Sequence, residues 1–564
     1  MYGPDNSSPD SDRWYCFRPR DVEPIAYNGW VRYRPATAVA AQSPASESAV
    51  EPLWYDMDVG IDSFAHIEFQ VEGRYLVTAP SLDRIFFDFS PVFAVHEVTD
   101  VRKQALDFWV EPARGGPQGI LVFLSRQFNR SDTLVLRFAY DGSPAIATSD
   151  GTFYLPCDLR WYPTVSPPAP VPIDARFTFP ATMSVVASGR RIREQDNGPT
   201  RRSFWVFSSG TPDFTFAFGD YGTRDYFYEG IPRVTVFTPR LLPDRVAADS
   251  LKDIVGDVLN GLGYFQKLFG PFPFGSLAVG EVPGAQHAVF GGLIHLPHRA
   301  FDPSSDGEPS TDCGHGVAAQ WWKYMLPVNS YRDQWFIEGV AEYSAGLYLE
   351  KSRKRKDLFS AAVGSWRDKV NTGCDAPAAG PLILGRRLPE RYLLARSAYA
   401  MHMLRMMMAD LDIDSDRRFL AMLRDFLEYY RGRVVTTQDF LQQAELYYGE
   451  PLDWFFRQWV YGTDIPAYTV RHEIERQSDG KYWVRLEVEQ TGVDGQFKMP
   501  VPVAVTFPRG RPYRSRVWVV GAKTTARLGP FEYRPQSIVF NDRDAVLTRR
   551  TEAADRIAET PAPR

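Results

Sequence analysis

The spacing of apolar residues changes twice along this 564-residue chain, and the two changes limit the folds that it can adopt. From about residue 64 to 237, short alternating runs broken by turn residues predict an antiparallel β region. Helical spacing follows, and alternation returns over 468–547. The expected helices are 311–325, 338–352, 357–370, 395–410, 417–431, 436–448 and 452–461.

Before these helices, the pattern predicts one further helix that begins at Asp249 or Ser250. It is followed by a strand in SLAVGEVP and a second strand in AVFGGLIHL. Together the patterns predict an α+β protein, too long for one ordinary domain. The expected parts are a flexible tail at 1–13, an antiparallel β domain at 14–236, a mostly helical domain at 237–466, a small β-sandwich at 467–548 and a flexible tail at 549–564.

Charge and cysteine content exclude several classes of protein. The net charge of −5 does not indicate a nucleic-acid or anionic-membrane partner. No apolar run approaches the length of a transmembrane helix. The start, MYGPDNSSPDSDR, lacks the features of a signal peptide, which favours a soluble cytoplasmic protein unless the numbering begins after processing. The four cysteines form no CxxC pair, which argues against a disulfide scaffold: Cys16, Cys157, Cys313 and Cys374.

The segment HGVAAQWW, which begins at His315, resembles a zinc-peptidase helix that has lost most of its chemistry. Such a helix carries H-E-x-x-H, with two histidine ligands one turn apart and a glutamate general base between them. Here Gly316 stands at the position of the base and Ala319 at that of the second histidine. Glu338, on the next predicted helix, stands where a third ligand is expected.

Catalytic zinc needs three protein ligands and a water molecule, and this motif supplies two. We therefore expect no metal cofactor, with zinc possible only if a substitute ligand completes the site. His287, on the strand that should flank the cleft, is the best substitute, and Cys313 is a second. Glycine at position 316 leaves no group in the motif to deprotonate a metal-bound water.

Each of these residues also has a purely structural interpretation. A histidine at the start of an apolar helix is commonly a hydrogen-bonded core residue, and a glutamate that opens a helix is stabilised by the helix dipole. The tryptophans and methionines of the helical region are most simply core packing: Trp321, Trp322, Trp335, Met401, Met403, Met406, Met407 and Met408.

Several segments together resemble the aminopeptidase-N-like zinc peptidases, peptidase family M1 of the gluzincins. AQHAVFGGLIHLP is similar to the family's G-x-M-E-N-x-G-L substrate strand, and DQWFIEGVAEY to its L-W-L-N-E-G-F-A segment. The eighteen-residue gap between Ala319 and Glu338 is the family's own. RSAYAMHMLRMMMADL and FFRQWVYGTDIP are similar to later family motifs, so the resemblance covers most of residues 150–470.

The resemblance implies an N-terminal β saddle domain, a thermolysin-like catalytic-type domain and a C-terminal β-sandwich. It also implies further losses. The glutamate that holds the substrate's amine falls on Val289, and the tyrosine that stabilises the tetrahedral intermediate falls near Leu394, with Tyr392 two residues away. The cleft that remains is expected to be lined by Gln286, His287, Gly291, Gly292 and Tyr392.

These losses predict a pseudo-peptidase: a non-catalytic binding or scaffold subunit whose partner is another protein or a peptide segment. The alternative is an active zinc aminopeptidase with a rebuilt metal site that uses His315, Glu338 and either His287 or Cys313. A third hypothesis is a structural module of a large assembly, with nothing bound in the cleft.

Overall fold

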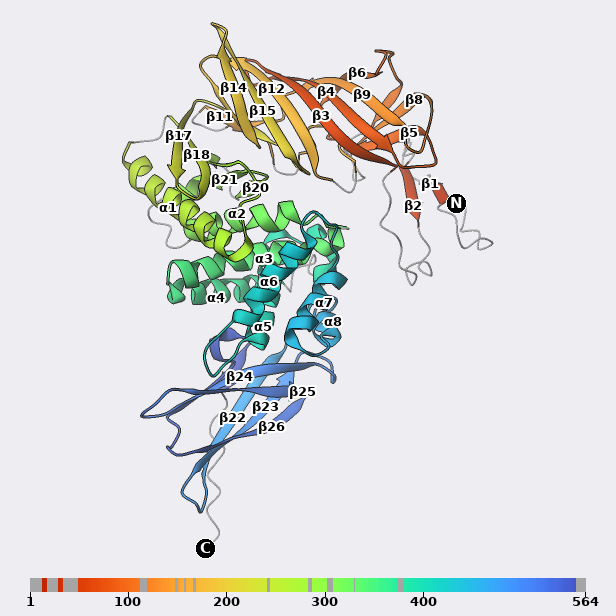
Figure 1. Ribbon diagram of the computed structural model, residues 1–564. Helices are drawn as coiled ribbons and strands as arrows, with labels where there is room; N and C mark the ends of the chain where they lie inside the picture. The colour runs from red at the N-terminus through yellow and green to blue at the C-terminus, as the bar shows by residue number, and fades with distance from the viewer. Residues whose placement is uncertain are drawn as a thin grey trace. The chain divides into compact units, whose positions relative to one another are not determined.

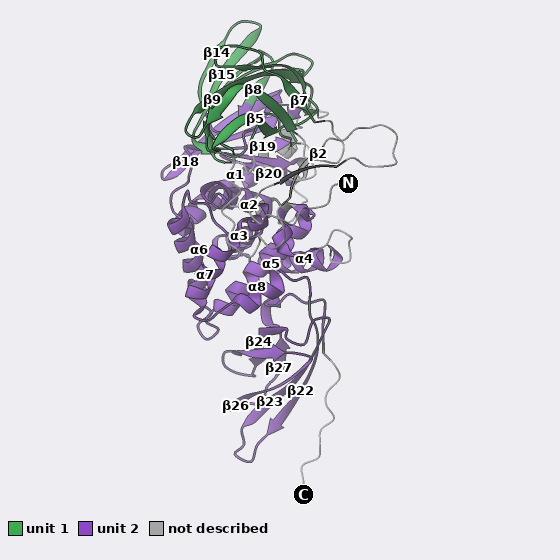
Figure 2. Cartoon of the chain, turned by 90° about the vertical axis from the view of Figure 1, so that its right-hand side faces the viewer, with its two compact units in different colours: residues 1–146, 154–185, 191–212 green, residues 147–153, 186–190, 213–564 purple. Residues whose placement is uncertain are grey.

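The computed structural model describes residues 13–17, 29–33, 49–111, 119–147, 151–156, 159–165, 169–240, 244–282, 287–301, 308–328, 330–373 and 380–553. It combines helices with many sheets (Figure 1). The chain divides into two compact units, one of residues 1–146, 154–185 and 191–212, the other of residues 147–153, 186–190 and 213–564 (Figure 2). The expected boundaries at 237 and 467 remain predictions.

A seven-stranded sheet in the order β14-β15-β12-β3-β4-β9-β6 dominates the first unit. Buried residues alternate with accessible ones along β3, β4, β9 and β12, because one face of the sheet packs into a core. The pairing is antiparallel as predicted, except that β12 runs parallel to β3. The strands are β3 (Val50–Ile61), β4 (Ile67–Val77), β6 (Ala94–Asp100), β9 (Thr133–Gly142), β12 (Val171–Pro180), β14 (Arg190–Asp196) and β15 (Thr200–Thr211).

Two smaller sheets complete the described part of this unit. One has three strands in the order β5-β8-β7, and the other is the pair β1-β2. The strands are β1 (Arg13–Phe17), β2 (Gly29–Tyr33), β5 (Ser81–Asp88), β7 (Phe108–Val110) and β8 (Gly119–Asn129).

The second unit holds a mixed five-stranded sheet in the order β17-β18-β19-β21-β20. The segment AVFGGLIHL, predicted as one strand, is an antiparallel hairpin of β20 and β21. The chain turns there because Gly292 has φ +68°, a conformation that glycine adopts without strain. The strands are β17 (Tyr221–Tyr228), β18 (Ile231–Pro239), β19 (Ser276–Val282), β20 (Ala288–Phe290) and β21 (Leu293–Pro297).

A four-stranded sheet in the order β10-β11-β16-β13 lies mostly in the second unit. Its strands are short, and β16 is buried along its whole length. The strands are β10 (Ile146–Ala147), β11 (Thr152–Tyr154), β13 (Ser184–Ala187) and β16 (Phe216–Gly219).

The predicted helices all form, but four of them, α1, α2, α3 and α5, begin three or more residues earlier than expected. The first begins at Asp244 and not at Asp249 or Ser250. Glu338 does not open its helix either, since that helix starts at Gln334. The α-helices are α1 (Asp244–Phe269), α2 (Glu308–Met325), α3 (Gln334–Leu347), α4 (Lys356–Gly373), α5 (Glu390–Met408), α6 (Arg417–Tyr430), α7 (Thr437–Tyr448) and α8 (Asp453–Trp459).

Shorter helical turns join several of these elements. The last turn after α3 is a π-helix. The turns are η2 (His298–Phe301), η3 (Tyr331–Asp333), η4 (Tyr348–Ser352), η5 (Leu382–Arg387) and η6 (Asp542–Asp544).

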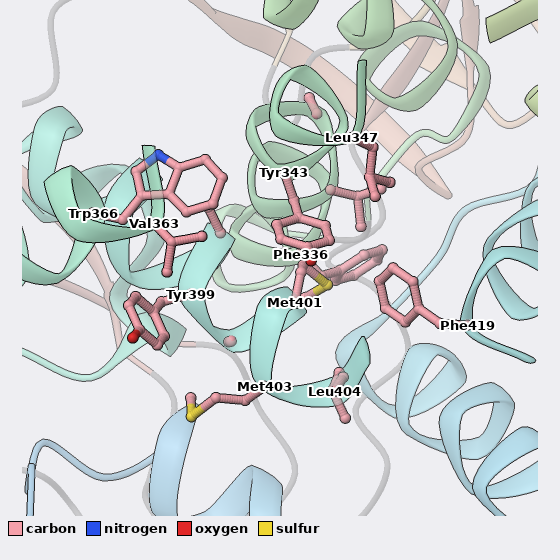
Figure 3. Packing of buried hydrophobic residues seen from close by; sticks show 14 of the residues in the cluster. Phe336, Tyr343, Leu347, Val363, Trp366, Tyr399, Met401, Met403, Leu404 and Phe419 are labelled. Atoms are coloured by element: carbon pink, nitrogen blue, oxygen red, sulfur yellow. The ribbon is translucent and has the colours of Figure 1, made fainter. Parts of the chain in front are cut away.

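Aromatic and sulfur-bearing side chains of α3, α4 and α5 fill the core between these helices. Figure 3 shows Phe336, Tyr343, Trp366 and Met401 among them. The three tryptophans and five methionines predicted to be core residues are all buried, which confirms that interpretation. No helix in the described ranges is both long enough and apolar enough to cross a membrane.

Two sheets follow the helices, in the orders β26-β23-β22-β28 and β25-β24-β27, and their buried faces share one core. Part of the expected C-terminal tail is ordered, because Thr551–Ala553 forms β28 and pairs in parallel with β22. The strands are β22 (Ala467–Arg476), β23 (Tyr482–Thr491), β24 (Lys498–Thr506), β25 (Tyr513–Val520), β26 (Lys523–Phe531), β27 (Ser537–Phe540) and β28 (Thr551–Ala553).

Candidate functional site

His315 on α2 pairs with a carboxylate of α3, and that carboxylate belongs to Glu342. The Nδ1 atom of His315 lies 2.8 Å from Oε2 of Glu342. Trp366 on α4 donates its indole N–H to the other carboxylate oxygen, Oε1, at 2.8 Å. The side chains of His315 and Glu342 are only 5% and 11% exposed. A single buried carboxylate thus joins three helices.

A second histidine–carboxylate pair lies against the first. Nδ1 of His287 lies 3.3 Å from Oδ1 of Asp312. The rings of His287 and His315 meet edge to face, with centroids 4.7 Å apart. The structure therefore brings His287, which immediately precedes β20, into contact with His315. We call His287, Asp312, His315, Glu342 and Trp366 the histidine cluster.

Burial and charge act against each other on the ionisable groups of this cluster. Burial raises the pKa of Glu342, but the hydrogen bond and charge of His315, with smaller contributions from Trp366 and His287, outweigh it and lower the pKa to about 2. Burial lowers the pKa of His287, but the hydrogen bond and charge of Asp312 outweigh it and raise the pKa above its ordinary value. Glu342 and His287 thus both favour their charged forms.

Glu338, the expected third ligand, is not in the histidine cluster. Among the residues that the structure describes, the side chain of Glu338 forms no hydrogen bond or ion pair. It lies four residues before Glu342, which is one helical turn, or about 6 Å, along the axis of α3. The pair that forms is therefore His315–Glu342 and not His315–Glu338.

The position that the resemblance assigns to the general base, Gly316, packs against an aliphatic side chain. A Cβ atom added to Gly316 would lie 3.0 Å from both Cδ1 and Cγ2 of Ile294 on β21. At Gly314 it would lie 3.1 Å from Cα of Ala345 on α3. Both glycines therefore lie where the neighbouring elements pack closely against α2. Ala319, at the position of the second histidine, is 1% exposed.

Side chains of α2 hold the β20–β21 hairpin, which contains the predicted cleft residues Gly291 and Gly292. Gln320 accepts the N–H of Gly292 at 2.8 Å and donates to the carbonyl of Phe290 at 3.1 Å. Lys323 and Tyr324 donate to the carbonyl of Val289 at 2.8 and 2.7 Å. Strand β20 lies at the edge of its sheet, where a peptide could add as a further strand. The side chains of α2 already occupy main-chain carbonyls of β20 that such a peptide would use.

Tyr392, the candidate oxyanion donor and cleft residue, is 4% exposed and bonded within the core. Its hydroxyl accepts a hydrogen bond from Nη1 of Arg396 at 2.7 Å and donates to the carbonyl of Gly380 at 3.4 Å. Arg396 also donates to the carbonyl of Gly462 at 2.8 Å. Leu394, which stands at the family's tyrosine position, is half-buried.

The remaining candidates do not join the histidine cluster. Burial, together with the charges of Asp257 and Asp312, raises the pKa of the Cys313 thiol well above its ordinary value, so a thiolate ligand is disfavoured. Burial lowers the pKa of His295 to about 3 and keeps that ring neutral. Gln286, predicted to line the cleft, lies outside the described residues.

The histidine cluster does not match the zinc site that the sequence resemblance implies. Catalytic zinc takes three protein ligands. The cluster offers two imidazoles, and its two carboxylates are already bonded to those imidazoles. In the described ranges, no three His, Cys, Asp or Glu side chains are grouped as metal ligands. We therefore derive no chemical step through zinc here.

Sequence reasoning gave no role to Glu342 or Trp366. Glu342 follows Glu338 by one turn, and spacing alone cannot decide which of the two faces His315. Trp366 lies 24 residues beyond Glu342 on another helix, and no local pattern links them. In comparisons with known proteins, no family model matches this chain, and no curated protein matches it significantly.

Proposed function

We propose that this chain is a non-catalytic protein with an aminopeptidase-like frame, which acts as a binding or scaffold subunit. The contact between Gly316 and Ile294 carries this proposal. The Ile294 side chain occupies the space where hydrolysis would need a general base beside a metal-bound water. A carboxylate side chain at position 316 would therefore have to displace this core residue.

The surroundings of the cleft support the same proposal. Val289 replaces the anchor for a substrate amine, and its carbonyl is already bonded to Lys323 and Tyr324. Tyr392 is bonded to Arg396, so its hydroxyl is not offered to a developing oxyanion. Several independent contributions to catalysis are therefore missing together. A peptide that binds this frame would need contacts other than strand addition at Val289.

The alternative, a metal-dependent aminopeptidase with a rebuilt site, is favoured by one observation. His287 and His315 lie in ring contact, and each has its Nδ1 atom against a carboxylate. Metal-ligating histidines commonly donate one ring nitrogen to a carboxylate in this way. A third ligand would still have to move into place.

Metal content and peptidase activity of the full chain separate the two proposals. We expect far less than one zinc per chain by elemental mass spectrometry after mild desalting, and no chelator-sensitive cleavage of aminoacyl or peptide substrates. His287→Ala and His315→Ala should leave both values at background. About one zinc per chain, lost in His315→Ala, together with chelator-sensitive cleavage, would instead establish the rebuilt enzyme.

A further inference from the structure

The three-stranded sheet β5-β8-β7 of the first unit presents a row of large apolar side chains to solvent. Phe86 on β5 and Trp109 on β7 both lie opposite Leu121 on β8. Opposite residues share a face of a sheet, and Phe123 shares it too because it lies two residues from Leu121. Phe86, Trp109 and Phe123 are 39%, 43% and 40% exposed. We call these four residues the aromatic face.

The aromatic face cannot turn inward, because the other face of the same sheet is already in the core. Ile85, Ile120 and Val122 point that way and are at most 5% exposed. The Phe86 ring lies over Gly119, where a Cβ atom would collide with it. A contiguous apolar patch of this kind on a protein surface commonly marks an interaction site.

The N-terminal strands β1 and β2 are a suitable occupant from the same unit. They pair antiparallel with each other in a sheet of their own. An isolated two-stranded hairpin is at best marginally stable in water, so it needs an apolar surface to pack against. Half of the ten residues in the two strands are aromatic, namely Trp14, Tyr15, Phe17, Trp30 and Tyr33.

After the hairpin, the described part of the chain resumes at residue 49, next to the three-stranded sheet. The carbonyl of Ala49 accepts hydrogen bonds from the N–H groups of Thr78 and Ala79 at 3.0 and 3.1 Å. Strand β5 begins at Ser81, two residues after Ala79. The connection 34–48, when extended, spans up to about 50 Å, longer than an eight-residue strand of about 27 Å.

Opposite charges also favour contact between the N-terminal strands and the aromatic face. Asp107 and Glu111 flank Trp109 by two residues on either side, so they lie on the same side of β7 as the aromatic face. The segment 13–33 carries more basic than acidic residues: Arg13, Arg18, Arg20 and Arg32 against Asp21 and Glu23.

We propose that residues 13–33 dock on the aromatic face of their own chain and cover Phe86, Trp109, Leu121 and Phe123. The proposal names a site and an occupant that the aminopeptidase resemblance does not assign, and it is independent of any chemistry at the histidine cluster.

Limited trypsin digestion of the full chain tests this docking, because the cleavable Arg20–Asp21 and Arg32–Tyr33 bonds lie within the segment. We expect slow cleavage there in the unmodified protein, and cleavage at least tenfold faster in Trp109→Asp/Phe123→Asp. Phe64→Asp is the matched control, since Phe64 is 88% exposed in the β3–β4 turn of the same unit. Equal cleavage rates in all three proteins would overturn the proposal.

A photoreactive phenylalanine analogue at position 109 gives a second readout that does not depend on how the charged variant folds. We expect a crosslink within one chain to residues 13–33, identified by mass spectrometry and independent of protein concentration. A crosslink between two chains would overturn the proposal and make the aromatic face a contact between copies. Crosslinks only to residues outside 13–33 would overturn it as well.

Discussion

At the scale of single residues, the properties of the site depend on which glutamate, Glu338 or Glu342, pairs with His315. Glu342 accepts bonds from both His315 and Trp366, so both of its oxygens are committed inside the protein. Breaking a buried pair by removing one partner typically costs about 3–5 kcal/mol, because the remaining charge is left without compensation. The histidine cluster can therefore be retained for stability, without any metal.

The lowered pKa of Glu342 predicts how this stability depends on pH. A carboxyl group with a depressed folded pKa contributes stability above its unfolded pKa of 4.5, and loses it as the pH falls toward about 2. The shift corresponds to about 3 kcal/mol. We expect Glu342→Gln to lower the free energy of unfolding by about that amount at pH 6, with the difference from the unmodified protein shrinking between pH 4.5 and 2.

Denaturant titrations of both proteins across this range would measure that difference. Glu338→Gln, one helical turn away, is the control and should behave like the unmodified chain at every pH. A difference for Glu342→Gln that stays constant from pH 6 to pH 2 would contradict the assignment of the pKa shift to the His315 pair.

At the scale of elements, glycines set how closely the helices approach. A Cβ atom on Gly339 of α3 would lie 2.7 Å from Cβ and 3.0 Å from the carbonyl carbon of Ser397 on α5. The backbone of α5 cannot move aside without disturbing Arg396, which anchors Tyr392 and Gly462. The contact between α3 and α5 is therefore a rigid feature of the core.

Gly339→Ala should destabilise the second unit by about 1–3 kcal/mol through overpacking, although alanine is the better helix former. Gly256→Ala in α1 is the matched control, because nothing lies within 4 Å of its added Cβ atom. That variant should gain up to about 1 kcal/mol from helix propensity. Melting temperatures by circular dichroism should thus shift in opposite directions, and equal shifts would refute this account.

At the scale of the whole molecule, two short segments of the N-terminal part of the chain belong to the second unit. Residues 147–153 and 186–190 leave the first unit and supply β11 and part of β13 to a sheet of the second. Strand β16 lies between β11 and β13, and its residues Phe216, Ala217 and Phe218 are fully buried. A cut at residue 213 would therefore remove both neighbours of a buried strand.

A chain of residues 213–564 is expected to aggregate, or to bind a hydrophobic dye far more strongly than the full chain, because β16 would lose its partners and its cover. Size-exclusion chromatography and dye fluorescence would show this. A monomeric fragment that melts cooperatively at the temperature of the full chain would show instead that residues 147–153 and 186–190 are dispensable.

The sequence by itself determined the types of the elements and which residues stand at the motif positions of the resemblance. Helical and alternating spacings located the α-helices and the main β regions of the described residues, because one buried face imposes its period on the chain. Residue identities alone show that positions 316, 319 and 289 carry glycine, alanine and valine. The ends of helices and the turn at Gly292 were missed, because they depend on a few polar or glycine residues rather than on a period.

Only the tertiary structure decided which groups meet. Whether Glu338 or Glu342 faces His315 depends on how α3 crosses α2, and that crossing is set by close contacts such as Gly314 with Ala345. The contact of Ile294 with Gly316 likewise joins a strand to a helix. Local spacing carries no information about such distant pairs, because they arise from packing whole elements into one core.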